Sequence, residues 1–403
     1  MPRVKDSPVK DRKRILYVNH ASKISGAERC MLRILENIDR ERFEPILVCP
    51  DGDLASEAEA RGTKVVRLKF VDYQSNRSLI LGRSVPNPLV ALAHALWLLS
   101  SGWRIGRIVR KSGVDLIHAN TLLSRIPAYL GGIFSHTPVI WHIRDILNSG
   151  PWLALYDIVA KRGVAGIISV SNACRSQFSD QSNIWTAYDG IPTDVFYSQP
   201  ERAAILRTSF GWSQQDVVFG IFGRITPWKG HERFVEAAIK VNRRFSQTRW
   251  LIVGEAWSDE EKKFEAKLKD MSVKAGLGST LVFTGFRNDI SSLMSTCDVV
   301  VVPSILPDPF PNTVLEGMSC ARAVVAFAVG GIPEAMEDGV TGRLVREKTA
   351  SSLALAMEEM ITNSNFRQEI GLNARKSVTE KFNAKENQRS IEYVYEIILK
   401  QHT

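Results

Sequence analysis

The chain has 403 residues, 44% of them hydrophobic and 24% charged, which is the composition of a folded protein long enough for two hydrophobic cores. Its net charge of +9 is uneven: residues 1–200 carry +8 and residues 201–403 carry +1. No nucleic-acid-binding pattern accompanies this charge, and no apolar run approaches the ~20 residues of a membrane-spanning helix. Five scattered cysteines without paired spacing, and the lack of a secretory signal, predict a cytoplasmic protein.

Strand-like apolar runs alternate with helix-like segments along the whole chain. In the first half, strands are expected at 14–20, 45–49, 64–68, 115–120, 139–143, 166–170 and 184–188. A second series begins afresh and gives strands at 217–223, 249–253, 281–284, 299–302, 324–328 and 342–345. Such alternation predicts parallel sheets covered by helices on both faces, and two separate series predict an α/β protein of two Rossmann-like domains.

The segment from Pro307 to Glu316 carries the strongest chemical signal. Three prolines keep its first half out of a helix, and Asn312 and Thr313 are residues that favour a helix start. The N–H groups and positive dipole end of a helix suit a phosphate. Asp308 before this start and Glu316 one turn inside the helix suit hydroxyl groups on either side of that phosphate. The segment therefore predicts a site for a nucleotide sugar.

A pair of cations follows the first strand of the second series. Gly223 ends that strand, Arg224 comes next, and Lys229 lies five residues further on. An arginine holds diphosphate oxygens in a fork and a lysine adds a compact charge, although such a pair alone is more often solvated surface. Together with the helix start they predict a diphosphate clamp that does the work of a metal ion. We therefore expect no metal and no cofactor.

Asp51-Gly52-Asp53 looks like a metal-binding Asp-x-Asp motif. It lies in a Pro-Asp-Gly-Asp turn after a strand, which is ordinary turn chemistry. We interpret it as a turn.

The segment from 307 to 316 resembles the Glu-x7-Glu signature of retaining GT-B glycosyltransferases of family four, with Asp308 in place of the first Glu. The segment from 222 to 230 is similar to that family's diphosphate-binding motif. Shorter pieces resemble the family in the same order along the chain, at 25–29, 142–145, 170–172, 189–191, 284–286 and 330–334.

This resemblance implies two Rossmann-like domains that face each other across a cleft. It implies an acceptor-binding domain at 14–198, a donor-binding domain at 199–382, and a helix at 383–403 that crosses back to the first domain. Residues 1–13, which are rich in charge and proline, are expected to form a flexible basic tail. The donor is a nucleoside-diphosphate sugar, the acceptor is a glycan, a lipid-linked sugar or another hydroxyl compound, and the product keeps the donor's α-configuration.

The resemblance also implies roles for individual residues. A lone histidine that ends an apolar strand is usually packed in the core, but the family has one beside the transferred sugar at the position of His142. The implied catalytic residues are His142, Arg224, Lys229 and Asp308. Donor contacts are implied for Gly26, Gly223, Arg224, Lys229, Phe286, Asp308, Phe310, Pro311, Asn312, Thr313, Val314 and Glu316. Gly26 can also be a plain turn glycine, and Arg144 is assigned to the acceptor or to holding its own loop.

The stretch from 89 to 111 is apolar first and basic second. Arg104, Arg107 and Lys111 fall on one helical face, with Trp97 and Trp103 nearby. One interpretation is a helix that packs against the first sheet. The other is an interfacial helix that lies on an anionic membrane and presents the site to a lipid-linked acceptor.

The sequence thus predicts a retaining, metal-independent glycosyltransferase that acts in cell-surface polysaccharide or glycolipid synthesis. It is expected in the cytoplasm or at the inner face of the cytoplasmic membrane. Two alternatives stay open: a sugar-nucleotide 2-epimerase of the same fold, and a non-catalytic sugar-nucleotide-binding protein, which the departure at Asp308 would fit. The sugar, the base and the acceptor are not identified.

Overall fold

The computed structural model describes residues 12–70, 77–80, 83–86, 88–147, 149–180 and 182–402. They divide into two compact units. Unit 1 holds the described residues up to 170, residues 174–187 and the chain from 387 onward, and unit 2 holds residues 171–173 and 188–386. Most of the expected N-terminal tail, residues 1–11, lies outside the described residues.

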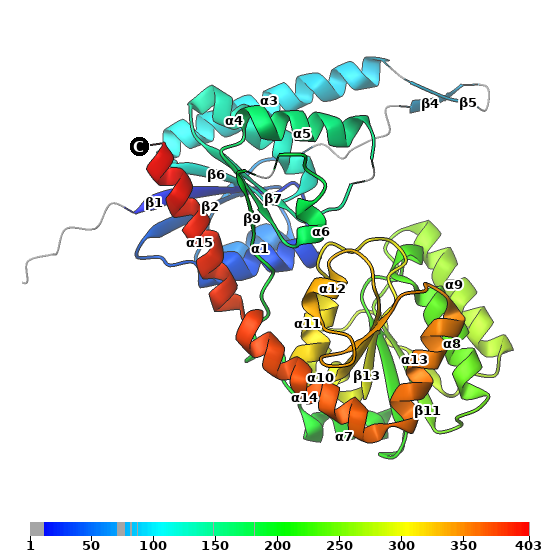
Figure 1. The fold of residues 1–403 in the computed structure, drawn as a ribbon. Helices are drawn as coiled ribbons and strands as arrows, with labels where there is room; N and C mark the ends of the chain where they lie inside the picture. Colours follow the sequence, from blue (N-terminus) through cyan, green and yellow to red (C-terminus); the bar gives the residue numbers. More distant parts are fainter. Residues whose placement is uncertain are drawn as a thin grey trace, which may run out of the picture. The chain divides into compact units, whose positions relative to one another are not determined.

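Unit 1 is built on a sheet of seven parallel strands (Figure 1). Their order is β3 (Lys64–Arg67), β2 (Phe43–Cys49), β1 (Lys13–Val18), β6 (Leu116–Ala119), β7 (Val139–Ile143), β8 (Gly166–Ser169) and β9 (Ile184–Thr186). The central strands are buried along their whole length, as expected of a parallel sheet covered on both faces.

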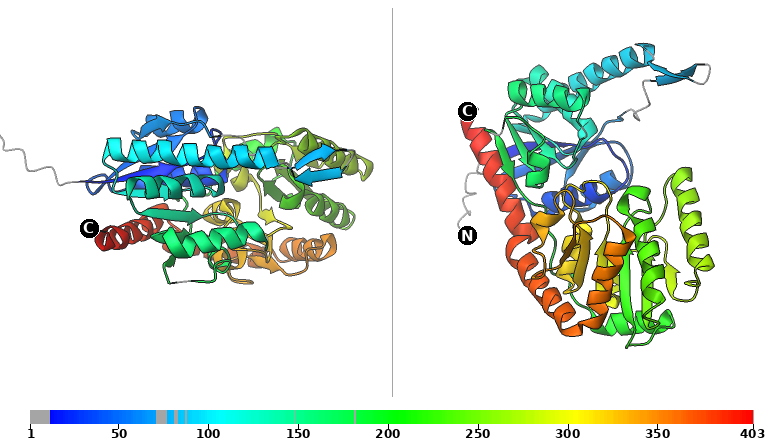
Figure 2. Two further views of the ribbon diagram at one scale, coloured as in Figure 1. Left: turned by 90° about the horizontal axis from the view of Figure 1, so that it is seen from above. Right: turned by 45° about the vertical axis from the view of Figure 1, so that its right-hand side comes forward.

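The helices of unit 1 are α1 (Gly26–Asn37), α2 (Asp53–Ala60), α3 (Pro88–Ser112), η1 (Leu122–Ser124), α4 (Arg125–Ser135), α5 (Pro151–Gly163) and the short α6 (Asn172–Arg175), whose first two residues count with unit 2. Figure 2 shows α3 lying along the outside of this unit. A small antiparallel pair, β4 (Arg77–Ile80) and β5 (Arg83–Pro86), precedes α3 and was not predicted.

Unit 2 has a six-stranded parallel sheet. Its order is β12 (Leu281–Phe283), β11 (Thr248–Val253), β10 (Val217–Phe222), β13 (Val299–Val302), β14 (Ala323–Phe327) and β15 (Arg343–Val345). Phe219 and Trp250 stack in its core with ring centroids 5.0 Å apart. The helices of this unit are α7 (Pro200–Ser209), η2 (Pro227–Lys229), α8 (His231–Asn242), α9 (Asp259–Lys274), α10 (Ile290–Thr296), α11 (Asn312–Ser319), α12 (Ile332–Ala335), α13 (Ala350–Thr362) and α14 (Ser364–Lys381).

The last helix, α15 (Ala384–Gln401), begins in unit 2, and from residue 387 it counts with unit 1. Four side chains of this helix are buried in the core of unit 1: Ile391, Val394, Tyr395 and Ile398. The predicted fold class, two Rossmann-like domains with parallel sheets, is confirmed. Within the described part of the chain, no helix is both long enough and apolar enough to cross a bilayer.

Candidate active site

Lys229 and Asp308 meet in unit 2. The Lys229 Nζ donates to the Asp308 Oδ2 at 2.7 Å and lies 4.3 Å from the ring centroid of Trp228. The Asp308 carboxylate is almost fully buried, with 7% of its side chain exposed, and the hydroxyl of Ser304 lies 3.5 Å from the same oxygen. The predicted clamp lysine and the predicted sugar-binding carboxylate are therefore direct partners.

Two glycine contacts bring these side chains together. Gly230 ends η2 with a φ of +79°, and a Cβ there would lie 1.8 Å from the Pro303 carbonyl oxygen. Gly330 has a φ of +56°, and its Cβ would lie 2.1 Å from the Asp308 carbonyl oxygen. The next residue, Gly331, donates its N–H to that same oxygen at 2.8 Å. Only glycine permits these close approaches, so the segment carrying Asp308 is fixed by backbone packing.

Arg224 follows Gly223, whose φ of +127° requires glycine, and takes different partners. Its Nε lies 3.3 Å from the Glu261 Oε1, and its guanidinium lies 4.9 Å from the ring centroid of Trp257. Glu261 also accepts the N–H groups of Trp257 and Ser258, in the capping box that starts α9. The sequence reasoning missed Glu261 and Trp257. The Ser258-x-x-Glu261 pattern was a visible capping signal, although it did not point to Arg224.

The helix start of the motif is α11, which begins at Asn312 with Pro311 as N-cap and without a side-chain cap. Thr313 and Glu316 are half-buried on its first two turns, whereas the Val314 side chain is fully buried. The Phe310 ring is also buried, 5.1 Å from the Tyr188 ring centroid and 5.6 Å from that of Phe382. Phe310 and Val314 can thus offer a ligand only backbone atoms. Phe286, by contrast, is 54% exposed.

In unit 1, His142 at the end of β7 belongs to a buried chain of polar groups. Its Nδ1 lies 3.1 Å from the His118 Nε2, and the His118 Nδ1 lies 2.7 Å from the Tyr395 hydroxyl. Burial, and next the Arg144 charge, hold the pKa of His142 well below its usual range, so the ring is neutral. Burial also lowers the pKa of His118 to about 3.

The tautomer of His142 follows from these contacts. The Arg144 Nη2 lies 3.5 Å from the His142 Nδ1, and a guanidinium can only donate, so Nδ1 accepts and the proton sits on Nε2. The Nε2 is buried and has no partner among the described residues. His142 therefore presents an N–H donor.

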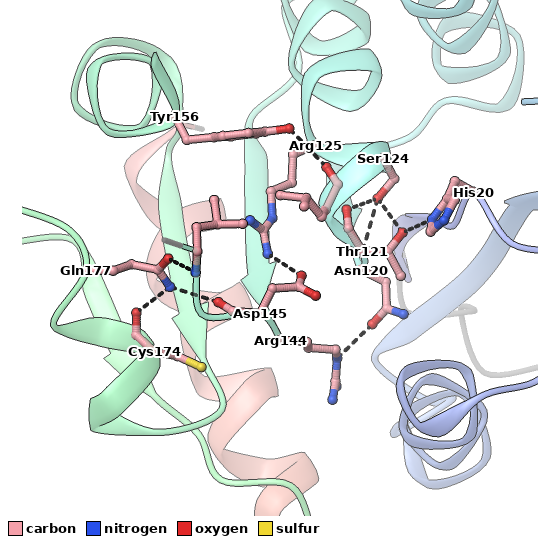
Figure 3. Close-up of polar contacts among 12 residues, drawn as sticks. His20, Asn120, Thr121, Ser124, Arg125, Arg144, Asp145, Tyr156, Cys174 and Gln177 are labelled. Atoms are coloured by element: carbon pink, nitrogen blue, oxygen red, sulfur yellow. Dashed lines mark hydrogen bonds and ion pairs between the residues drawn. The ribbon is translucent and has the colours of Figure 1, made fainter. Parts of the chain in front are cut away.

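Arg144 is tied to the start of α1 through asparagines (Figure 3 draws its bond to Asn120). Its Nε donates to the Asn120 Oδ1 at 3.1 Å, and the Asn120 Nδ2 donates to the Asn19 Oδ1 at 3.0 Å. The Asn19 Nδ2 in turn donates to Glu28 at 3.2 Å, and Glu28 forms the capping box of α1 with Ser25. Gly26, the first residue of α1, is exposed. The turn at Gly26 and the loop at Arg144 are thus joined by one buried network.

The remaining predicted residues lie elsewhere. Arg104, Arg107 and Lys111 are exposed on α3. Asp51 forms an ion pair with Arg67 at 2.8 Å in the turn before α2. Among the described residues no three His, Cys, Asp or Glu side chains gather as a metal-binding group.

Two Rossmann-like units, with a cation and a carboxylate at a helix start in the second, define a nucleotide-sugar enzyme of the GT-B fold. Two family models match: "Glycosyltransferase Family 4" over residues 24–195 and "Glycosyl transferases group 1" over residues 204–377. The chain belongs to the group 1, or family 4, glycosyltransferases, and the predicted resemblance is confirmed.

Relatives and solved structures agree with this assignment. An uncharacterised glycosyltransferase of Methanocaldococcus jannaschii is 28% identical over 303 residues, which is 74% of this chain and 72% of that protein. A D-inositol 3-phosphate glycosyltransferase of Mycobacteroides abscessus is 31% identical over 197 residues, 48% of this chain and 41% of that one. The crystal structure of Anabaena HepE with UDP and glucose superposes with a TM-score of 0.81 at 25% identity, covering 96% of this chain and 100% of HepE.

Proposed function

We propose that this glycosyltransferase is retaining and metal-independent, and that it moves a hexose from a UDP-sugar to a sugar hydroxyl. The observation that carries the proposal is the contact between Lys229 and Asp308 in unit 2. Uridine is the base we favour, because HepE was solved with UDP and with UDP-glucose.

Each residue has a distinct role in the proposed reaction. As the glycosidic bond breaks, negative charge grows on the departing diphosphate, and the ammonium of Lys229 stabilises it in a partly buried setting. Arg224, steadied by Glu261 and Trp257, adds the second cation. Asp308 accepts hydrogen bonds from sugar hydroxyls, Glu316 accepts those of the ribose, and the Nε2–H of His142 donates to the transferred sugar. The departing phosphate takes the acceptor proton, so the proposal needs no protein base.

The test is a transfer assay on the purified chain. UDP-glucose, UDP-galactose, UDP-N-acetylglucosamine, GDP-mannose and ADP-glucose are each offered with methyl and octyl glycosides of glucose, galactose and mannose. Mass spectrometry finds the product and NMR assigns its anomeric configuration. We expect an α-linked product. A donor isomerised at C2 without transfer would favour the epimerase, and binding without any turnover would favour a non-catalytic protein.

We also propose that α3 contacts an anionic membrane, where a lipid-linked acceptor of polysaccharide or glycolipid synthesis would lie. Five large apolar side chains are exposed along the helix at a spacing of three to four residues: Leu89, Leu92, Leu96, Leu99 and Trp103. Because these five side chains are exposed, packing in the protein core does not explain their regular spacing. Arg104, Arg107 and Lys111 continue the helix as an exposed basic end, with the Arg107 guanidinium 4.8 Å from the Trp103 ring centroid. Apolar side chains followed by cations fit a lipid interface.

Vesicle co-sedimentation tests this contact. Each cation near an anionic surface is worth about 1 kcal/mol, so Arg104/Arg107/Lys111→Gln should weaken binding about 100-fold at low salt. The matched control, Lys262/Lys263/Lys274→Gln, removes the same charge from exposed positions of α9 in unit 2. Equal binding by both triple variants, or equal binding to neutral and anionic vesicles, would argue for a soluble acceptor.

A further inference from the structure

Arg125 and Asp145 form an unusual ion pair in unit 1. Arg125, the first residue of α4, is fully buried, and its Nη2 donates to the Asp145 Oδ2 at 3.1 Å. Its guanidinium lies 5.7 Å from the ring centroid of Tyr156. The other two guanidinium nitrogens have no partner among the described residues. Asp145, just beyond β7, keeps 42% of its side chain exposed.

Burying Arg125 in this ion pair costs folding free energy. Burying a guanidinium with unpaired donors is costly, and an apolar side chain of similar size would fill the same space without that cost. In keeping with this, burial lowers the pKa of Arg125. What the buried charge provides is a fixed partner for an otherwise exposed carboxylate. An exposed carboxylate usually pairs with a flexible surface cation, whereas the cation here cannot move because it is packed on every side.

The backbone around Asp145 is fixed as well. The Gln177 Nε2 donates to the Asp145 carbonyl at 2.9 Å and to the Cys174 carbonyl at 2.8 Å, and the Leu147 N–H donates to the Gln177 Oε1 at 3.2 Å. One glutamine therefore ties the Asp145 loop to the neighbouring segment (Figure 3). With both its main chain and one carboxylate oxygen held, Asp145 is pre-organised to accept hydrogen bonds.

The position of the pair in the fold indicates what it binds. Asp145 follows the carboxyl end of β7, beside the end of β6, where Asn120 and Thr121 lie. Ligands of open parallel sheets bind at the carboxyl ends of the strands. The Thr121 hydroxyl lies 2.7 Å from the His20 Nδ1, and Arg144 donates a hydrogen bond to Asn120. These groups therefore already have hydrogen-bond partners within the protein. The exposed part of the Asp145 carboxylate is thus a charged acceptor beside the ends of β6 and β7.

We infer that Asp145 binds a pair of neighbouring hydroxyls on the acceptor sugar, and that Arg125 is a positioning residue that acts through Asp145. The inference rests on the proposed function and deepens it: the acceptor presents a sugar diol to unit 1, separate from the hydroxyl that reacts. A carboxylate suits this role because its two oxygens accept from both members of a diol. None of the donor contacts proposed above involves Arg125 or Asp145, so donor binding should be independent of this pair.

The experiment compares Asp145→Asn with Asp39→Asn. Asp39 is a matched control because 38% of its side chain is exposed and it is also paired with an arginine, Arg42, but it precedes β2 at the amino end of the same sheet. The probes are UDP-glucose and the methyl and octyl glycosides. Asp145→Asn should raise the acceptor KM about 10-fold or more while leaving the donor KM and the rate of donor hydrolysis within about twofold.

Arg125→Met should raise the acceptor KM in the same direction, and the double variant should resemble Asp145→Asn alone, because Arg125 acts through Asp145. An additive double variant would refute the positioning role. The inference is overturned if Asp145→Asn keeps the acceptor KM of Asp39→Asn, or if a donor that is hydrolysed is transferred to none of the glycosides. A chain that neither hydrolyses nor transfers any donor would instead count against the proposed function.

Discussion

Replacing Gly330 with alanine should disable the donor site by moving Asp308. The new Cβ would lie 2.1 Å from the Asp308 carbonyl oxygen and 2.6 Å from its nitrogen, against a practical limit of 3.0 Å. Both are backbone atoms, so the segment must shift by roughly 1 Å, and a misplacement of that size can cost about 100-fold in rate. The φ of +56° adds a conformational cost of about 1–2 kcal/mol for a residue with a Cβ.

Gly339→Ala separates these two effects. Gly339 has a φ of +75° but nothing within 4 Å of its would-be Cβ, so this variant carries the conformational cost alone. Steady-state kinetics with the donor that the transfer assay selects, on protein whose folding is verified by circular dichroism, should show Gly339→Ala near wild type. Gly330→Ala should lose about 100-fold in kcat/KM. If both variants have the same kcat and donor KM, glycine packing does not position Asp308 for the reaction.

Three further predictions address the charges and buried histidines. Lys229→Ala should lower turnover by about 100-fold or more because it removes the cation beside the leaving group, whereas replacing the exposed Lys240 of α8 with Ala should not; equal rates would refute the clamp. Transfer should survive excess EDTA, and activity lost in chelator and restored by magnesium or manganese would refute metal independence. Burial lowers the pKa of His231 from 6.5 to about 4, so between those values the unfolded state alone is protonated and the free energy of unfolding should fall by about 1.4 kcal/mol for each pH unit of acidification. Urea unfolding at several pH values in this range measures that dependence. The change in unfolding free energy per pH unit should be smaller by that amount in His231→Asn, and the same pH dependence as in the wild type would contradict a neutral native His231.

The sheets could be predicted because their strands are buried on both faces. Val299–Val302 is apolar without a break and Val217–Phe222 nearly so, and each of the thirteen predicted strands lies within two residues of an observed one. The pair β4 and β5 was missed because the sequences of its strands, Arg77–Ile80 and Arg83–Pro86, contain no unbroken apolar run.

The candidate site could be predicted only where chemistry is local in sequence. Lys229, Asp308 and the start of α11 lie in the segments that follow strand ends, so their motif is visible along the chain. Their direct pairing depends on Gly330, which packs on Asp308 from 22 residues away, and the sequence does not encode that contact in any periodic pattern. Arg125 was likewise invisible, because nothing in its neighbours indicates that a helix would begin with a fully buried guanidinium.

Calorimetric titration of nucleoside diphosphates tests the donor site most directly. UDP, GDP and ADP are titrated into the wild-type chain, Lys229→Ala and Lys240→Ala. The account predicts that the wild type and Lys240→Ala bind UDP equally, and that Lys229→Ala binds it at least about 10-fold more weakly, since a lost charge-assisted contact is worth about 1.5–3 kcal/mol. Binding of none of the three diphosphates by the wild type, or unchanged UDP affinity in Lys229→Ala, would contradict it.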